Sequence, residues 1–77
     1  MANVKVYSTA TCPYCIRAKE FLKQNNVEFE NLDVGSDSQA AQDMKAKSGQ
    51  MGVPVIDIDG QIIVGFDKPA ISKALGI

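Results

Sequence analysis

The chain has 77 residues and contains no histidine, no tryptophan and only two cysteines. A structural zinc site takes four sulfur or nitrogen ligands, so a single copy of this chain cannot complete one, and we expect no metal. Eight basic residues are balanced by nine acidic residues, which argues against a nucleic-acid partner or a membrane-binding basic segment. The remaining chemistry lies in the two thiols, whose partners are small thiols and protein disulfides.

Long apolar runs are also missing from the sequence. No stretch reaches the length of a membrane span, and the first residues lack the basic segment and apolar run of a secretory leader. We therefore expect a cytoplasmic protein without membrane association. The length permits one domain, residues 1–77, with one small core. In the cytoplasm, a Cys-x-x-Cys pair near a strand and a helix indicates catalysis rather than a structural disulfide.

Both cysteines stand in the stretch Thr11-Cys12-Pro13-Tyr14-Cys15. Pro13 has a fixed φ and no N–H, so it suits the first position of a helix and makes Cys12 the N-cap. There the amides of Tyr14 and Cys15, together with the helix dipole, stabilise a thiolate at Cys12. Cys15 lies on the same helix face, at a separation that a disulfide can close. The spacing predicts a redox-active dithiol in which one sulfur attacks and the other resolves.

Two other interpretations of the cysteine pair are weaker. A structural disulfide between Cys12 and Cys15 would close a very short loop and would remove little chain entropy. A zinc site would need ligands from a second chain, because this chain supplies only two cysteines and no histidine. The redox interpretation is therefore preferred.

Hydrophobic periodicity and turn residues predict the order strand, helix, strand, helix, strand, strand, helix. The predicted strands are residues 4–7, 27–32, 53–58 and 61–64. Right-handed crossovers make the first two strands parallel, and the Asp59-Gly60 turn joins the last two as an antiparallel hairpin. We therefore predict an α/β fold, a four-stranded mixed sheet with helices on both faces.

Cap residues predict where the helices begin and end. The first helix should end at Asn25-Asn26, because asparagine tolerates the left-handed conformation. Ser36 with Gln39 forms a capping box that should start the second helix, and Gly49 should end it. Asp67 is the predicted N-cap of the last helix.

Three short motifs occur in an order and spacing that resemble a bacterial glutaredoxin: Cys12-Pro13-Tyr14-Cys15, Val53-Pro54 and Gly65-Phe66-Asp67. The resemblance covers nearly the whole chain and implies the minimal thioredoxin fold, with the order βαβαββα. It implies that Cys12 is the nucleophile and that Cys15 resolves the mixed disulfide. Thr11, Pro13 and Tyr14 then support the active site.

The same resemblance assigns the substrate-binding segments. Val53-Pro54 matches the family's Thr-Val-Pro motif, with Gly52 in place of Thr, which implies a cis Pro54 close to Cys12. Val53 would offer its backbone N–H and C=O to the substrate peptide as a short added strand.

Gly65-Phe66-Asp67 matches the family's Gly-Gly-x-Asp, which binds the γ-glutamyl end of glutathione. The amides of Asp67 and Lys68 at a helix N-terminus suit a carboxylate, and the Asp67 side chain suits an ammonium group. Plain helix capping explains Asp67 equally well.

The chain departs from the family pattern at two positions. Thr9 stands where most glutaredoxins have a lysine that contacts the glycyl carboxylate of glutathione, and Gln50 would partly fill that role. Val64 replaces the first glycine of the late motif. The Gly65-Phe66 pair is similar to that of the glutaredoxin-like electron donors of ribonucleotide reductase, which thioredoxin reductase recharges.

The expected function is that of a monomeric, glutathione-dependent thiol–disulfide oxidoreductase. It would reduce protein disulfides or glutathione mixed disulfides, with glutathione as co-substrate and no bound cofactor. One alternative is an electron donor that a flavoprotein reductase recharges. A less favoured alternative is a binding module in which Cys12 of two chains and two thiol cofactors hold an iron–sulfur cluster.

Overall fold

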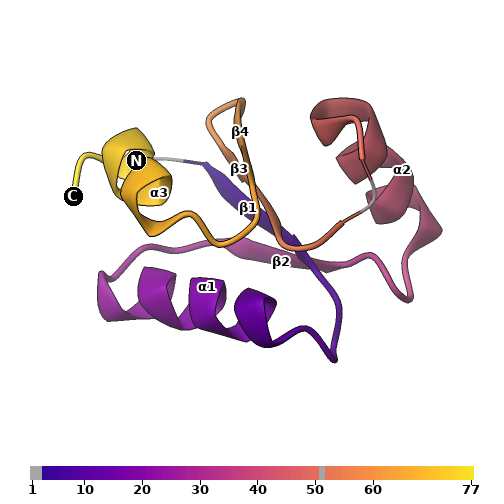
Figure 1. Cartoon of the computed structure of the whole chain (residues 1–77), viewed down its shortest axis with the longest axis horizontal. Coiled ribbons are helices and arrows are strands. Elements are labelled where there is room, and N and C mark those ends of the chain that lie inside the picture. Colours follow the sequence, from indigo (N-terminus) through magenta and orange to yellow (C-terminus); the bar gives the residue numbers. More distant parts are fainter. Residues whose placement is uncertain (1–2, 51) are drawn as a thin grey trace.

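The structure is a computed structural model that describes residues 3–50 and 52–77. Its elements follow the predicted order βαβαββα (Figure 1). In chain order they are β1 (Val4–Ser8), α1 (Pro13–Gln24), β2 (Glu30–Asp33), α2 (Ser38–Ser48), β3 (Val55–Ile58), β4 (Gln61–Val64) and α3 (Lys68–Leu75). The predicted fold class, a four-stranded mixed sheet with three helices, is confirmed.

The four strands lie in the order β2-β1-β3-β4. β1 pairs with β2 in parallel, as a helical crossover requires, and with β3 in antiparallel. A two-residue turn joins β3 to β4, and its residues Asp59 and Gly60 have φ values of 51° and 90°. Positive φ at both central residues is what a tight type I′ hairpin needs, so the predicted hairpin is confirmed.

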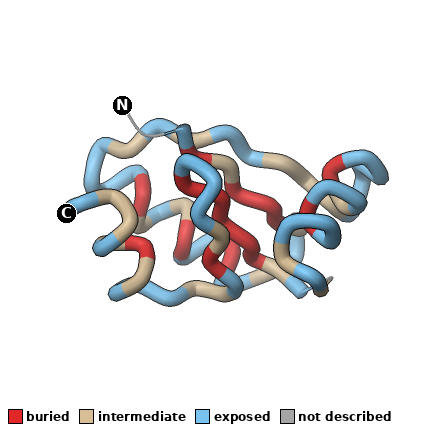
Figure 2. The backbone as a smooth tube through the Cα atoms, turned by 90° about the horizontal axis from the view of Figure 1, so that it is seen from above, coloured by how far each residue is buried: buried red, intermediate tan, exposed pale blue. Residues whose placement is uncertain are grey.

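The helices cover both faces of the sheet because side chains alternate along each strand. Val6 of β1 belongs to a cluster of buried residues under α1 and α3, whereas Tyr7, the next residue, belongs to a smaller cluster under α2. Buried residues are concentrated in the central strands (Figure 2). The first cluster has eight buried members and the second has four, so the apolar core lies mainly on the side of α1 and α3.

The second strand was predicted at residues 27–32 but begins only at Glu30. The cause is the end of α1, where Asn26 adopts a left-handed φ of 57° and the amide of Val27 donates to the carbonyl of Leu22 at 2.9 Å. The backbone of Val27 therefore completes the helix end instead of pairing with β1. The predicted helix end at Asn25-Asn26 is correct.

The third strand was predicted from residue 53 but begins at Val55. Pro54 has no N–H for the sheet, and its carbonyl accepts a hydrogen bond from the amide of Gly65 at 2.7 Å. The first strand also extends one residue further than predicted, to Ser8.

The predicted start of the second helix at Ser36 is wrong. The N-cap of α2 is Asp37, whose Oδ1 accepts hydrogen bonds from the amides of Gln39 at 3.0 Å and Ala40 at 3.2 Å. A carboxylate at this position satisfies two free amides and also interacts favourably with the helix dipole. Gly49 ends α2 with a left-handed φ of 74°, as predicted.

Candidate active site

Cys12 lies at the N-terminus of α1 in the geometry that the sequence predicts. Its backbone is extended, Pro13 follows in the first turn, and Cys12 is the N-cap. The amide of Cys15 donates to Cys12 Sγ at 3.2 Å. The second predicted bond, from the amide of Tyr14, is not among the hydrogen bonds of the described residues. One backbone donor therefore faces the sulfur of Cys12.

The two thiols differ in accessibility. Cys12 is half-buried, whereas Cys15 has an exposed fraction of 0%. Burial raises the pKa of the Cys15 thiol from 9.0 to about 11, and its contact with Cys12 acts in the same direction. Cys15 is therefore a protonated thiol at neutral pH, and an incoming disulfide can reach only Cys12 of the two.

The Val53-Pro54 segment lies beside Cys12 although 41 residues separate Cys12 from Val53. The Val53-Pro54 peptide bond is cis, which confirms the conformation that the family resemblance implies. Cys12 Sγ lies 4.0 Å from the carbonyl oxygen of Val53. The ring of Pro54 is buried, and β3 begins at the next residue, Val55. The fold thus brings a backbone carbonyl next to the accessible sulfur.

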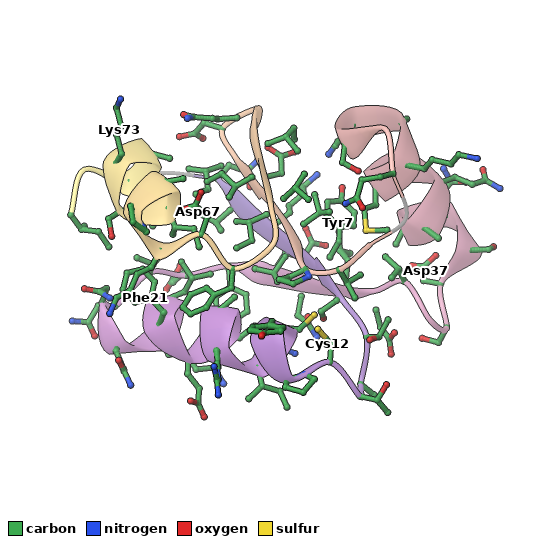
Figure 3. The ribbon with its side chains drawn as sticks, in the orientation of Figure 1. Tyr7, Cys12, Phe21, Asp37, Asp67 and Lys73 are labelled. Atoms are coloured by element: carbon green, nitrogen blue, oxygen red, sulfur yellow. The ribbon has the colours of Figure 1, made fainter. Side chains whose placement is uncertain are left out.

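Gly65 connects the third motif to the second through its hydrogen bond to the Pro54 carbonyl. Asp67 is the N-cap of α3, as predicted, and accepts a hydrogen bond from the amide of Ala70 at 3.2 Å. Phe66 is half-buried and packs edge-to-face on Phe21, with the ring centroids 6.2 Å apart. Figure 3 shows Asp67 at the start of α3 and Phe21 on α1 below it. The contact of Phe66 with Phe21 therefore ties the segment before α3 to α1. Asp67, the next residue, is exposed.

The remaining predicted residues lie around Cys12. The carbonyl of Thr9 accepts a hydrogen bond from the amide of Cys12 at 3.4 Å, and Thr11 is exposed. The Tyr14 ring is 59% exposed and lies under the guanidinium group of Arg17, 5.7 Å from the ring centroid. These residues form the open side of the site.

Gln50 holds the loop that precedes Val53. Its side-chain amide donates to the carbonyl of Gly52 at 3.1 Å and accepts from the amide of Gly52 at 2.9 Å. These two contacts engage the side chain that the sequence suggested as a partial substitute for the missing lysine.

Sequence reasoning missed the residues that link α2 to the sheet. Lys47 contacts Asp57 and Tyr7, which are 10 and 40 residues away in the chain. No periodic pattern connects positions at such separations, so only the charge and polarity of these residues were visible in the sequence. Within residues 3–50 and 52–77, no three His, Cys, Asp or Glu side chains gather as metal ligands. None of the helices in this part of the chain is both long and apolar enough to cross a membrane.

A thioredoxin-like fold with a Cys-x-x-Cys pair at the start of its first helix defines a class of thiol–disulfide oxidoreductases. The glutaredoxin family model matches residues 4–63. The chain therefore belongs to the glutaredoxin family, and this membership supports a thiol–disulfide oxidoreductase role.

Two relatives and two solved structures illustrate the similarity. An uncharacterized glutaredoxin-like 8.6 kDa protein in the rubredoxin operon of Clostridium pasteurianum is 49% identical over 72 residues, which cover 94% of this chain and 96% of that protein. Glutaredoxin 3 of Escherichia coli K12 is 43% identical over 67 residues, covering 87% and 81%.

The structure of a variant of the thioredoxin-like protein BC3987 superposes with a TM-score of 0.93 at 35% identity, covering 100% of this chain and 99% of that chain. The glutaredoxin of Archaeoglobus fulgidus superposes with a TM-score of 0.88 at 28% identity, covering 97% and 87%. Sequence and structure comparisons thus agree on the family and on the fold.

Proposed function

We propose that this protein is a dithiol oxidoreductase that reduces protein disulfides and glutathione mixed disulfides through Cys12 and Cys15. The observation that carries the proposal is the arrangement of the two sulfurs. Cys12 Sγ is accessible and accepts a hydrogen bond from the Cys15 amide at 3.2 Å, while the Cys15 thiol is buried behind it. This arrangement suits an attacking sulfur and a resolving sulfur.

The proposed cycle begins when the Cys12 thiolate attacks one sulfur of the substrate disulfide. A bond forms between Cys12 and that sulfur, and the other substrate sulfur leaves as a thiolate that takes a proton from water. Cys15 then gives up its proton and attacks Cys12 Sγ, which releases the second substrate thiol. Two electrons have passed to the substrate, and the protein carries a Cys12–Cys15 disulfide that two glutathione molecules reduce.

Val53 supplies the proposed docking edge for a peptide substrate. Its carbonyl oxygen faces Cys12 Sγ at 4.0 Å, so an extended segment that pairs with Val53 would carry its disulfide to the nucleophile. Backbone pairing of this kind tolerates many side chains, which suits a reductase of several proteins.

Glutathione is the proposed co-substrate, bound at the exposed start of α3. The amides of Asp67 and Lys68 at this helix start suit the γ-glutamyl carboxylate, and the Asp67 side chain suits the ammonium group. Cys12, Cys15 and Val53 of one chain supply the groups that the cycle uses, so we propose that the protein acts as a monomer, and we propose that it carries no bound cofactor. Its cycle needs the reducing conditions of the cytoplasm, where we propose that it works.

A second candidate is an electron donor that a flavoprotein such as thioredoxin reductase recharges. The observation that favours it is Val64, whose side chain is 53% exposed at the position of the family's first motif glycine. A bulky apolar side chain there offers contact area to a protein partner and narrows the space for a small ligand.

A coupled assay separates the two candidates. The oxidised protein is supplied first with glutathione and glutathione reductase, and then with thioredoxin reductase, while nicotinamide oxidation is followed. We expect turnover with the glutathione system. Turnover with thioredoxin reductase alone would favour the electron-donor candidate, and turnover with neither system would refute the proposed function.

A further inference from the structure

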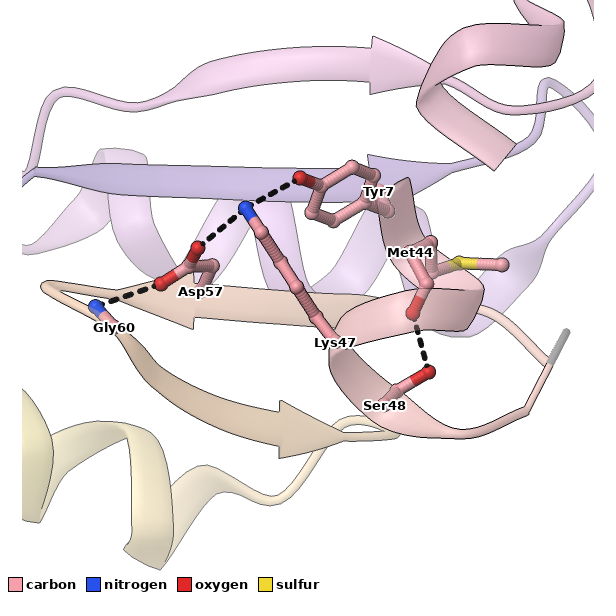
Figure 4. A network of polar contacts seen from close by, with 6 residues as sticks. All are labelled: Tyr7, Met44, Lys47, Ser48, Asp57 and Gly60. Carbon is pink, nitrogen blue, oxygen red and sulfur yellow. Dashed lines mark hydrogen bonds and ion pairs between the residues drawn. The ribbon is translucent and has the colours of Figure 1, made fainter. Parts of the chain in front are cut away.

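Lys47 makes a three-way polar contact between α2 and the sheet. Its ammonium group lies 2.8 Å from Asp57 Oδ2 on β3 and donates to Tyr7 Oη on β1 at 2.9 Å (Figure 4). The exposed fractions of Tyr7 and Asp57 are 1% and 8%. The second carboxylate oxygen of Asp57 accepts from the amide of Gly60 at 2.8 Å. Both oxygens of this carboxylate are therefore satisfied inside the fold.

The Lys47 ammonium and the Asp57 carboxylate stabilise each other in their charged forms. Burial opposes ionisation of Asp57, but the hydrogen bonds from Lys47 and Gly60 outweigh it and hold the pKa of the carboxyl below its usual value. The bonds to Asp57 and Tyr7 raise the pKa of the Lys47 ammonium. Both groups are charged at neutral pH, and loss of Lys47 leaves the buried Asp57 carboxylate poorly compensated, whereas the Lys47 side chain is 33% exposed to solvent.

The end of α2 depends on the Lys47 contact, because few residues of this helix are buried. Among the residues of α2, only Ala40 and Met44 are buried, so the buried packing of the helix stops at Met44, about one turn before its end. Lys47 lies in the last turn, directly before Ser48 and the Gly49 cap. The ammonium group thus anchors the end of α2 to β1 and β3.

The end of α2 leads directly to the docking edge beside Cys12. The amide of Gln50 donates to Ser48 Oγ at 3.4 Å, and the Gln50 side chain is bonded to the backbone of Gly52. Val53 follows, with its carbonyl 4.0 Å from Cys12 Sγ. A series of short-range contacts therefore connects the anchored helix end to the carbonyl that faces the nucleophile.

Both partners of the Lys47 side chain, Tyr7 and Asp57, belong to the strands that support the site. Tyr7 precedes Ser8, the last residue of β1, from which the loop to Cys12 starts. Asp57 lies on β3, which continues from Pro54. Lys47 is thus bonded to both strands whose ends carry the nucleophile and the docking edge.

We propose that Lys47 is a positioning residue that sets the docking edge at Val53 relative to Cys12. By binding Asp57 and Tyr7 at once, it holds the end of α2 at a fixed place on the sheet. The proposal rests on the proposed thiol–disulfide exchange, and it assigns to Lys47 a role in substrate docking rather than in the chemistry of the sulfurs.

The test compares Lys47→Met with the wild-type protein on two substrates. One is a peptide disulfide, which uses the docking edge, and the other is hydroxyethyl disulfide, which has no peptide backbone. We expect KM for the peptide disulfide to rise about fivefold, a change that corresponds to a modest loss of docking free energy. The rate with hydroxyethyl disulfide and the alkylation rate of Cys12 should stay unchanged. Lys45→Met, which removes an exposed charge from the same helix, should match the wild type on both substrates.

Two further variants separate positioning from general stability. Lys47→Arg keeps the charge and several hydrogen-bond donors, so its KM for the peptide disulfide should lie close to the wild-type value. The double variant Lys47→Met with Asp57→Asn removes the uncompensated carboxylate and should regain stability toward urea. Because this double variant still lacks the contact from residue 47 to β1 and β3, its KM for the peptide disulfide should stay above the wild-type value.

The outcomes distinguish the two proposals. A wild-type protein that exchanges with neither substrate would refute the proposed function, and the positioning role would fall with it. An active wild type with an unchanged peptide KM in Lys47→Met would overturn the positioning role alone. A double variant that recovers both stability and KM would also overturn it, because Lys47 would then act only through the stability of the fold.

Discussion

The site has two halves that differ in how far apart their parts lie in the chain. The nucleophile segment, Cys12 to Cys15, is set by contacts within a single helical turn, such as the 3.2 Å bond from the Cys15 amide to Cys12 Sγ. The docking segments, Val53-Pro54 and Gly65 to Asp67, are far from Cys12 in the chain. The folding of the sheet places Val53 beside Cys12 and bonds Gly65 to Pro54. Under the proposed function, reactivity is therefore a local property of this chain, whereas recognition is a property of the fold.

The largest expected effect comes from breaking the nucleophile segment. Cys12→Ser should reduce all exchange to the uncatalysed background, because Cys12 is the accessible sulfur. Cys15→Ser should lose the reduction of protein disulfides, which requires a resolving thiol, but should keep monothiol exchange with glutathione mixed disulfides. Steady-state rates with both substrate types check this, and equal losses in the two variants would contradict the assigned roles.

The second prediction sharpens the difference between the two sulfurs. A pKa of about 11 against the ordinary 9.0 leaves roughly a hundredfold less thiolate at Cys15 than at an unperturbed cysteine at neutral pH. Alkylation with iodoacetamide followed by mass spectrometry of the two cysteines should show Cys12 modified first and Cys15 at least about a hundredfold more slowly. Primary labelling of Cys15 would reverse the assignment.

The same shift predicts how stability depends on pH. The folded-state pKa of Cys15 lies above its unfolded value, so its contribution is fully present below pH 9.0 and is lost as the pH rises toward 11. Between about pH 8 and about pH 10.5 the reduced protein should lose roughly 2 kcal/mol of unfolding free energy from this group. In urea titrations Cys15→Ser should lack this part of the decrease. The difference between the wild type and Cys15→Ser therefore separates the contribution of Cys15 from that of titrating lysines.

The two halves also differ in how well the sequence predicts them. Pro13 at the first helical position fixes Cys12 as the N-cap, and the Asp59-Gly60 pair fixes the hairpin, because each depends on neighbours within a few residues. The family resemblance added the cis bond before Pro54. Local chemistry was therefore sufficient for the order of elements and for the nucleophile segment.

The failures of prediction occur where one backbone group has two competing partners. Val27 alternates with Phe29 like a strand, but its amide binds the Leu22 carbonyl at the end of α1. Ser36 fits a capping box, but the Asp37 carboxylate, one residue later, is the stronger acceptor. The Lys47 contacts were invisible because they join three elements that only the folded sheet brings together.

The fourth prediction tests the docking side by adding a charge. Thr9→Lys should lower KM for glutathione mixed disulfides roughly tenfold, because a sheltered charged contact to the glycyl carboxylate contributes about 1.5 kcal/mol. Exchange with hydroxyethyl disulfide should stay nearly unchanged, since that substrate has no carboxylate. Gln61→Lys adds the same charge at an exposed position beside the β3–β4 turn, at the end of the sheet away from Cys12, and controls for net charge. An equal gain in both variants would show a general electrostatic effect instead of a glutathione contact.

The smallest expected effect concerns Asp67, which is both the cap of α3 and the proposed partner of the glutathione ammonium group. Asp67→Asn keeps a good N-cap and removes the charge, so stability should change by only a few tenths of a kcal/mol. The lost contact is exposed, and such pairs contribute about 0.2 to 1 kcal/mol, so KM for glutathione mixed disulfides should rise about 1.4-fold to fivefold. Asp67→Ala should add a loss of about 1 kcal/mol in stability, because the bond to the Ala70 amide is then lost as well. If Asp67→Asn leaves KM unchanged while Asp67→Ala raises it, Asp67 acts as a cap alone, and glutathione recognition lies elsewhere on the docking side.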